Sequence, residues 1–264
     1  EVGSTNRTHV EDYEKAISKS TKILLWVHTS NYIMKGYTKE VPLEDIVSIG
    51  KKYKIPVVAD LGSGSFIDMS NFDIPSEIPV SEIVKKGPDI TLFSGDKMLG
   101  GPQSGIILST KILINIIKSN SIYRTVRCDK ITIAILDDII RSYKKNGFLK
   151  SNLALMLLTK DRKTLKKMAE EIINSVQEHK LRTLGLTIED SMVEAGSGSL
   201  PEKNLKSVTL KFSPKNISID IISKSFKQYK VPIIGFINRN SFFIDLKAVL
   251  PSQSFHIIDA INKV

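Results

Sequence analysis

The sequence predicts an α/β fold with a mainly parallel sheet, followed by a smaller α+β domain. Three short apolar runs, each bounded by polar residues, Gly or Pro, predict buried strands at 22–28, 55–59 and 89–93. A helical pattern at 42–53 separates the first two runs, and buried strands that alternate with helices are typical of parallel sheets. A chain of 264 residues that is 41% hydrophobic can form one large domain with a smaller appendage.

Further elements complete the predicted large domain. Thr8, with Glu11 three residues later, has the spacing of a capping box and predicts a helix that runs to about Ser18. A fourth strand is expected at 105–109, after a Gly-rich turn, and a helix at 129–145.

The second half of the chain has a different pattern. A break at Asn146-Gly147 is followed by a long, strongly charged helix at about 161–180. We therefore expect a large domain over 1–150 and a small domain over 151–264. The small domain is predicted to contain strands at 187–194, 206–212, 231–236 and 241–247, with helices near 218–229 and 252–263.

Composition excludes several classes of protein. The single Cys128 and the four histidines provide neither a disulfide framework nor a metal-ligand cluster. No apolar run approaches the roughly 18 residues of a membrane span, and the polar N-terminus has no secretory signal. We expect a cytoplasmic protein that binds neither membranes nor DNA. The net charge of +10 suits a polyanion such as RNA, or reflects lysines that solvate helix faces.

Polar residues gather where the predicted strands end, which is where parallel sheets place functional groups. Lys97 follows the strand at 89–93, and Ser94 lies three residues before it. One turn could thus offer a hydroxyl to a phosphate and an amine to an aldehyde, the chemistry of a lysine that forms a Schiff base with pyridoxal phosphate. The alternative is an ordinary surface lysine.

Asp60 ends the strand at 55–59 and precedes the glycine-rich run LGSGS. A carboxylate at a buried strand end needs a cation, and the pyridinium nitrogen of pyridoxal phosphate is one. Asp60 and Lys97 are then spaced for opposite ends of one cofactor ring; the alternative is an aspartate that caps its turn. His28, at the end of the first strand, could stack on a planar cofactor or simply be hydrogen-bonded there.

Arg124 and Arg127 are three residues apart and are expected to share a helix face. Two guanidinium groups so placed suit a tetrahedral oxyanion such as phosphate. The alternative is an ordinary pair of surface arginines before a helix.

Several motifs together resemble those of bacterial selenocysteine synthase, L-seryl-tRNA(Sec) selenium transferase, a fold-type-I pyridoxal-phosphate enzyme. The resemblance covers almost the whole chain, and SGDKMLGGPQ followed by VRCDK is its most specific part. The matching stretches are EVGSTNRTH (1–9), VHTSNY (27–32), VVADLGSGS (57–65), TLFSGDKMLGGPQSGII (91–107), RTVRCDK (124–130), EAGSGSLPE (194–202) and PIIGFINRNSFFIDLKAVLP (232–251).

The resemblance implies roles for residues and partners. Lys97 matches the Schiff-base lysine, Asp96 its acidic neighbour, and Asp60 the partner of the pyridine nitrogen. Arg124 and Arg127 match the pair that holds the selenium donor. His28 falls where the family has a ring-stacking or substrate-facing residue, and Ser94, assigned to the phosphate from its place in the Lys97 turn, completes the expected cofactor site. The substrates implied are seryl-tRNA(Sec) and selenophosphate, and an active site between subunits implies at least a homodimer.

Two departures from the family pattern leave other functions open. Phe236 stands where the family usually has arginine, and the family's N-terminal tRNA-binding domain and first large-domain strands do not precede residue 1. We therefore expect an N-terminally incomplete chain. The alternatives are a related pyridoxal-phosphate lyase that acts on a small amino acid, and a non-catalytic remnant that binds RNA or a partner.

Overall fold

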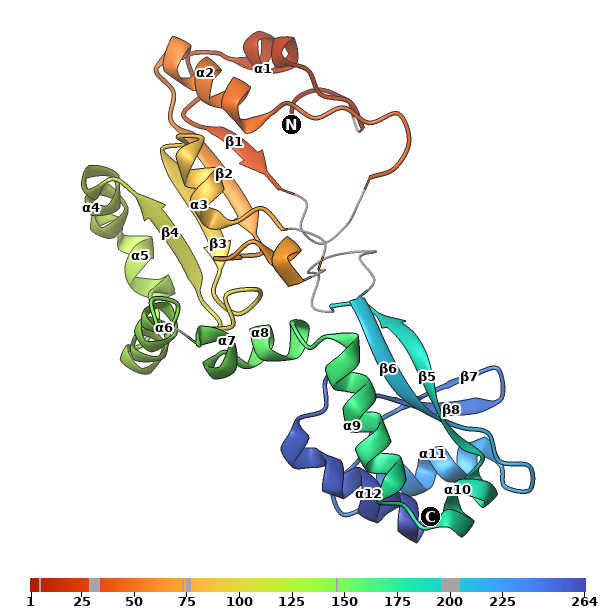
Figure 1. Cartoon of the computed structure of the whole chain (residues 1–264). Coiled ribbons are helices and arrows are strands. Elements are labelled where there is room, and N and C mark those ends of the chain that lie inside the picture. The colour runs from red at the N-terminus through yellow and green to blue at the C-terminus, as the bar shows by residue number, and fades with distance from the viewer. Residues whose placement is uncertain (5, 29–33, 73, 75–76, 146, 196–204) are drawn as a thin grey trace. The chain divides into compact units, whose positions relative to one another are not determined.

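The computed structural model divides the chain into two compact units (Figure 1). The first is formed mainly by Glu1–Leu155, and the second by Met156–Glu194 and Asn204–Val264. The residues that the structure describes are 1–4, 6–28, 34–72, 74, 77–145, 147–195 and 205–264. Parts of the motifs at 1–9, 27–32 and 194–202, and Asn146 of the predicted break, lie outside them.

The first unit contains a four-stranded sheet in the order β1-β2-β3-β4. Its strands are β1 (Leu24–Val27), β2 (Val57–Gly62), β3 (Ile90–Ser94) and β4 (Gly105–Ser109). The first three are parallel, and β4 runs antiparallel to β3. The prediction of a mainly parallel sheet is confirmed.

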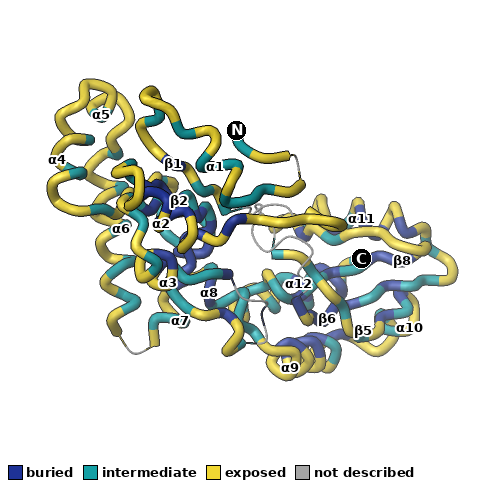
Figure 2. Tube along the Cα trace, turned by 90° about the horizontal axis from the view of Figure 1, so that it is seen from above, coloured by how far each residue is buried: buried dark blue, intermediate teal, exposed yellow. Residues whose placement is uncertain are grey.

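Helices cover this sheet and supply much of the core. Helix α2 (Leu43–Tyr53) packs against β1 and β2, because its apolar residues recur at helical spacing and are buried. By contrast, α4 (Lys111–Ser119) and α5 (Ser121–Val126) have no buried residues, and Figure 2 shows them largely exposed. The remaining helices up to the unit boundary are α1 (Val10–Ala16), η1 (Met69–Phe72), α3 (Val80–Lys85), α6 (Lys130–Ser142), α7 (Phe148–Ser151) and α8 (Leu153–Leu158).

The first helix does not start as the capping-box spacing predicted. His9, not Thr8, is the N-cap, and the Asp12 carboxylate accepts a hydrogen bond from the His9 backbone N–H at 2.8 Å. Thr8 instead donates its backbone N–H to the Lys39 carbonyl at 2.9 Å, beside a bridge between Arg7 and Lys39. A tertiary pairing therefore overrides the local signal at Thr8.

The second unit is an antiparallel sheet in the order β5-β6-β8-β7 with helices packed on it. Its strands are β5 (Leu186–Val193), β6 (Leu205–Phe212), β7 (Phe236–Asn238) and β8 (Ser241–Asp245). The helices are α9 (Arg162–Asn174), α10 (Glu178–Leu184), α11 (Ile219–Gln228), η2 (Pro251–Gln253) and α12 (Ser254–Lys263). No described helix in either unit is long and apolar enough to cross a membrane.

Two predicted elements of this unit are wrong in their bounds. The long helix at 161–180 is two helices, because α9 ends at Asn174 and the chain turns to bury Val176 before α10 begins. The strand predicted at 231–236 lies later, at β7. A two-residue turn, Arg239-Asn240, has positive φ at both positions and pairs Asn238 with Ser241, and such a turn sets the register of the hairpin.

Three phenylalanines form the centre of the second unit's core. Phe212, Phe226 and Phe242 are fully buried, and their ring centroids lie 5.2 to 5.7 Å apart. Phe212 comes from β6, Phe226 from α11 and Phe242 from β8, so the cluster joins the sheet to the helix. Aromatic pairs at these distances contribute beyond the area they bury.

We predict that Phe226→Ala lowers the free energy of unfolding by about 3–5 kcal/mol, because it removes a ring from a close-packed cluster. Urea denaturation followed by circular dichroism measures this. Phe255→Ala is the matched control: Phe255 is 56% exposed, so its loss should cost below about 1 kcal/mol. Equal effects of the two substitutions would contradict the assignment of the core.

Candidate functional site

The register of the parallel strands brings two predicted site residues together. Asp60 pairs with Val27 on β1 and with Leu92 on β3. The His28 backbone N–H donates to the Asp60 carbonyl at 2.8 Å, so His28 and Asp60 are neighbours at the carboxyl edge of the sheet. Both side chains are half-buried. This is the edge at which ligands bind in open α/β sheets.

A backbone hydrogen bond joins the loop after Asp60 to the turn that contains Lys97. The Met98 N–H donates to the Ser63 carbonyl at 3.0 Å. The residues after Asp60 and the residues around Lys97 are therefore one structural unit. The structure thus brings Asp60, Lys97 and His28 to the same edge of the sheet.

The Lys97 turn is closed by its own backbone. Gly95 N–H donates to the Ser104 carbonyl and Gly101 N–H to the Gly95 carbonyl, each at 2.8 Å. Gly100 N–H donates to the Lys97 carbonyl at 3.0 Å. These bonds fix the path of the backbone on both sides of the lysine, whose side chain is half-buried.

The two neighbours of Lys97 named by the sequence differ in exposure. Asp96 is exposed, whereas Ser94 is half-buried as the last residue of β3. Side chains alternate along a strand, so Ser94 lies on the opposite face of β3 from Phe93, which packs in the core.

Close packing against the backbone explains why position 64 of the LGSGS run is a glycine. Gly64 has φ of +71°, and a Cβ there would lie 2.5 Å from the Ser94 carbonyl oxygen. A residue with a side chain would both strain the backbone and push this loop away from the end of β3.

Ser63 is a site residue that the sequence reasoning did not single out. Its side chain is fully buried, and among the described residues its hydroxyl has no hydrogen-bond partner. A buried, unsatisfied hydroxyl costs about 1–3 kcal/mol. Its place between the Asp60 and Lys97 loops fits a site in which a bound group supplies that partner. The sequence offered no signal beyond the glycines on either side.

His28 is held by two residues that were also not predicted. Its ring stacks on Trp26, with centroids 5.7 Å apart and planes 17° apart. His28 Nε2 lies 3.8 Å from Oε2 of Glu77, a carboxylate that is only 3% exposed. One face of the histidine is therefore occupied by Trp26. A buried acid beside the sheet edge is a tertiary feature that sequence spacing does not show.

The arginine pair does not share a helix face, contrary to the sequence prediction. Arg124 is in α5, but α5 ends at Val126 and Arg127 has extended backbone, with φ −68° and ψ 138°. The cause is Asp129, whose carboxylate accepts the N–H groups of the first turn of α6 at 2.7 and 3.0 Å. This cap starts a new helix and forces Arg127 out of the preceding one. Both arginines are exposed.

The arginines precede α6, and the residues after Lys97 pack along this helix. Arg127 precedes the 13-residue helix, which is about 20 Å long at 1.5 Å per residue. A Cβ at Gly101 would lie 3.4 Å from the Leu136 side chain in the middle of α6, and beyond its C-terminal end the Tyr143 hydroxyl donates to the Leu99 carbonyl at 2.8 Å. No hydrogen bond or ion pair among the described residues joins either arginine to the Lys97 turn.

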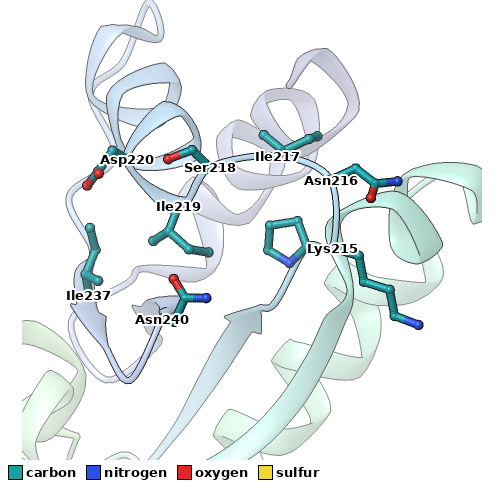
Figure 3. Close-up of a pocket in the computed structure, with 9 residues that line it drawn as sticks. Lys215, Asn216, Ile217, Ser218, Ile219, Asp220, Ile237 and Asn240 are labelled. Carbon is teal, nitrogen blue, oxygen red and sulfur yellow. The ribbon is translucent and has the colours of Figure 1, made fainter.

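A separate cavity of about 540 Å³ lies in the second unit (Figure 3). Residues 214–220, before and at the start of α11, line it together with Ile237 and Asn240 of the β7–β8 hairpin. It contains none of the residues predicted for the site.

Comparison with solved structures identifies the fold. The chain resembles a structure titled D-glucosaminate-6-phosphate ammonia-lyase with a TM-score of 0.63 and 17% sequence identity, covering 100% of this chain and 62% of that one. The mainly parallel sheet with a smaller antiparallel unit is the architecture of fold-type-I pyridoxal-phosphate enzymes.

The family model SelA, L-seryl-tRNA selenium transferase, matches residues 1–250, and the chain belongs to this family. A relative from Carboxydothermus hydrogenoformans named L-seryl-tRNA(Sec) selenium transferase is 37% identical over 96% of this chain and 54% of its own length. A relative of the same name from Desulfotalea psychrophila is 40% identical over 94% of this chain and 54% of its own length. The chain thus spans about half the length of the curated relatives it matches.

We predict that Gly64→Ala destabilises the protein by roughly 1–3 kcal/mol more than Gly147→Ala, because only the first adds a steric clash. Both glycines have positive φ, so both substitutions carry the same kind of backbone strain. A Cβ at Gly147 meets nothing within 4 Å, whereas at Gly64 it meets Ser94. Thermal and urea unfolding measure the difference; equal losses would show that the loops are not packed as described.

Proposed function

We propose that this chain forms the pyridoxal-phosphate-binding part of an enzyme that converts seryl-tRNA(Sec) to selenocysteinyl-tRNA(Sec) with selenophosphate. Membership of the family supports the reaction. The observation that carries the assignment of the site is the hydrogen bond between Met98 and Ser63, which joins the Asp60 loop to the Lys97 turn. The first unit is proposed as the cofactor-binding domain and the second as the small domain.

The residues at the sheet edge fit pyridoxal phosphate. Lys97 would hold it covalently through a Schiff base, Asp60 would face its ring nitrogen, and Ser94 would donate to its phosphate. The unsatisfied hydroxyl of Ser63 leaves a hydrogen-bond donor in the Asp60 loop, and the absence of a side chain at Gly64 lets this loop pack against the end of β3. Bound there, the cofactor supplies an electron sink for charge that develops at the substrate Cα.

The chain's own groups would then control protons. Once the amino group of the seryl substrate has displaced it from the cofactor, the freed Lys97 amine would be the base that accepts a proton from the Cα of the seryl group. Asp60 would keep a proton on the ring nitrogen by ion pairing. Asp96, exposed beside Lys97, is proposed as the second catalytic group, in reach of solvent where water leaves the seryl side chain. His28, held by Trp26 and Glu77, would orient the cofactor ring.

The arginine pair is proposed to act in a site shared between copies of the chain. Arg124 and Arg127 would bind the selenium donor, since two guanidinium groups suit a tetrahedral oxyanion. Both are exposed, and no hydrogen bond or ion pair among the described residues joins them to their own Lys97 turn. We propose that they serve the site of a second copy in a homo-oligomer. The net charge of +10 suits tRNA as the polyanionic substrate.

We predict that pyridoxal phosphate attaches to Lys97. Borohydride reduction followed by tryptic mapping should place one adduct on the peptide that contains Lys97. Lys97→Ala should abolish the adduct with little change in the thermal midpoint, because the side chain is half-buried and contributes little to the core. Lys118→Ala, an exposed lysine of α4, is the control and should keep the adduct. An adduct on another lysine would exclude this role.

We predict that Arg124→Ala and Arg127→Ala each slow selenium incorporation by tenfold or more, roughly the loss of one charge-assisted hydrogen bond, while the adduct on Lys97 persists. Arg141→Ala is the control, because Arg141 is an exposed arginine already paired with Asp137. Mixing the Arg127→Ala and Lys97→Ala chains should recover about a quarter of the rate, the random value for a two-fold dimer. No recovery would rule out a shared site.

A further inference from the structure

We infer that Tyr143 and Asn152 are positioning residues that fix the Lys97 turn against the Asp60 loop. The two side chains converge on one backbone carbonyl, that of Leu99, and we call this arrangement the Leu99 clamp. The inference rests on the proposed role of Lys97 and adds two residues that no motif of the sequence indicated.

The clamp consists of two donors on one acceptor. Tyr143 Oη donates to the Leu99 carbonyl at 2.8 Å, and Asn152 Nδ2 donates to the same oxygen at 2.8 Å. Asn152 Nδ2 also lies 3.3 Å from Tyr143 Oη. A carbonyl oxygen has two lone pairs, so both bonds can form together. Leu99 itself is fully buried, two residues beyond Lys97.

The hydrogen bonds around Asn152 require a side-chain amide and not just any polar group. Its side chain is 0% exposed, and its Oδ1 accepts the Leu155 N–H at 3.1 Å, which caps the first turn of α8. The oxygen and the nitrogen of the amide are thus both used, which fixes its orientation. Gly100 has φ of +72°, and a Cβ there would clash with the Asn152 side chain. The amide therefore lies directly against the backbone of the turn.

Tyr143 contacts the other loop as well. Its ring centroid lies 5.2 Å from that of Phe66, the residue that follows the LGSGS run after Asp60. On another side it stacks on Phe148 at 5.3 Å. Burial raises the pKa of Tyr143 above its usual value, which keeps the hydroxyl a neutral donor. One side chain thus links the Asp60 loop through its ring and the Lys97 turn through its hydroxyl.

The clamp limits where the flexible side chain of Lys97 can place its amine. A lysine side chain has several rotatable bonds, so it can be placed accurately only if the backbone below it is fixed. The turn's own hydrogen bonds close its loop, and the bond from the Met98 N–H to the Ser63 carbonyl joins it to the Asp60 loop. The clamp adds a second attachment, at the carbonyl of Leu99.

The test is hydrogen exchange of the purified chain without cofactor, read on peptides that cover 94–101. Tyr143→Phe removes only the hydroxyl and keeps the ring contacts. It should speed exchange in this turn by about threefold to tenfold, the loss of one hydrogen bond, and leave the other segments of the first unit unchanged. Tyr13→Phe is the matched control, because the Tyr13 hydroxyl lies 3.5 Å from a different carbonyl, that of Leu25.

A second variant and a second reading separate positioning from general stability. Asn152→Asp keeps an oxygen for the Leu155 N–H but replaces the donor that faces Leu99, so it should speed exchange in the turn more than Tyr143→Phe does. In both variants, acetylation of the Lys97 amine by acetic anhydride should become faster, while attachment of pyridoxal phosphate to Lys97 becomes slower. A lysine that is merely loosened is easier for a small reagent to reach but less well placed for the cofactor.

The clamp is overturned if exchange in the turn is unchanged in both variants, or if it rises equally throughout the first unit. Unchanged acetylation of Lys97 in both variants contradicts it as well. Failure of the proposed function looks different: the wild-type chain would form no adduct on Lys97, whereas the exchange and acetylation results, which need no cofactor, would still show the clamp.

Discussion

The hydrogen bond from Met98 N–H to the Ser63 carbonyl determines the geometry on which the rest of the site depends. It joins two loops that leave adjacent parallel strands, and parallel pairing is what brings both loops to the same edge. Gly64 allows the close approach that the bond requires, since a side chain there would meet the end of β3. A carboxylate and an amine that are 37 positions apart in the sequence, at Asp60 and Lys97, are thereby held in one local structure.

The residues that hold this candidate site rigid lie beneath the side chains that are proposed to do the chemistry. Neither Lys97 nor Asp60 is deeply buried, and a cofactor or substrate needs such access. The buried polar groups, Ser63 and Asn152, lie in the layer below, where hydrogen bonds are stronger and unpaired groups are costly. Helix α6 extends this layer outward, because its C-terminal end contacts the lysine turn through Tyr143 and its N-terminal end follows the exposed arginines.

The sequence was most informative where a local pattern and the tertiary structure agree. The apolar runs predicted β1, β2 and β3, and the polar residues after them were therefore placed at the correct edge, including Asp60 and Lys97. Prediction failed where a tertiary contact or the start of the next helix decides the local structure. Thr8 had a good capping pattern but pairs with Lys39, and Arg127 had helical spacing but precedes the cap of α6. Glu77, Ser63 and Asn152 could not be found, because only burial distinguishes them from polar residues of a surface loop.

The most direct test of the central claim is an experimental structure of the protein with pyridoxal phosphate bound. The account predicts continuous density from Lys97 Nζ to the cofactor ring, and an Asp60 carboxylate oxygen at about 2.7–3.0 Å from the ring nitrogen, the distance of a charge-assisted hydrogen bond. The ring would lie at the carboxyl edge of β1, β2 and β3, above the joined loops. A cofactor attached to another lysine, or a ring nitrogen that faces no carboxylate, would contradict the account.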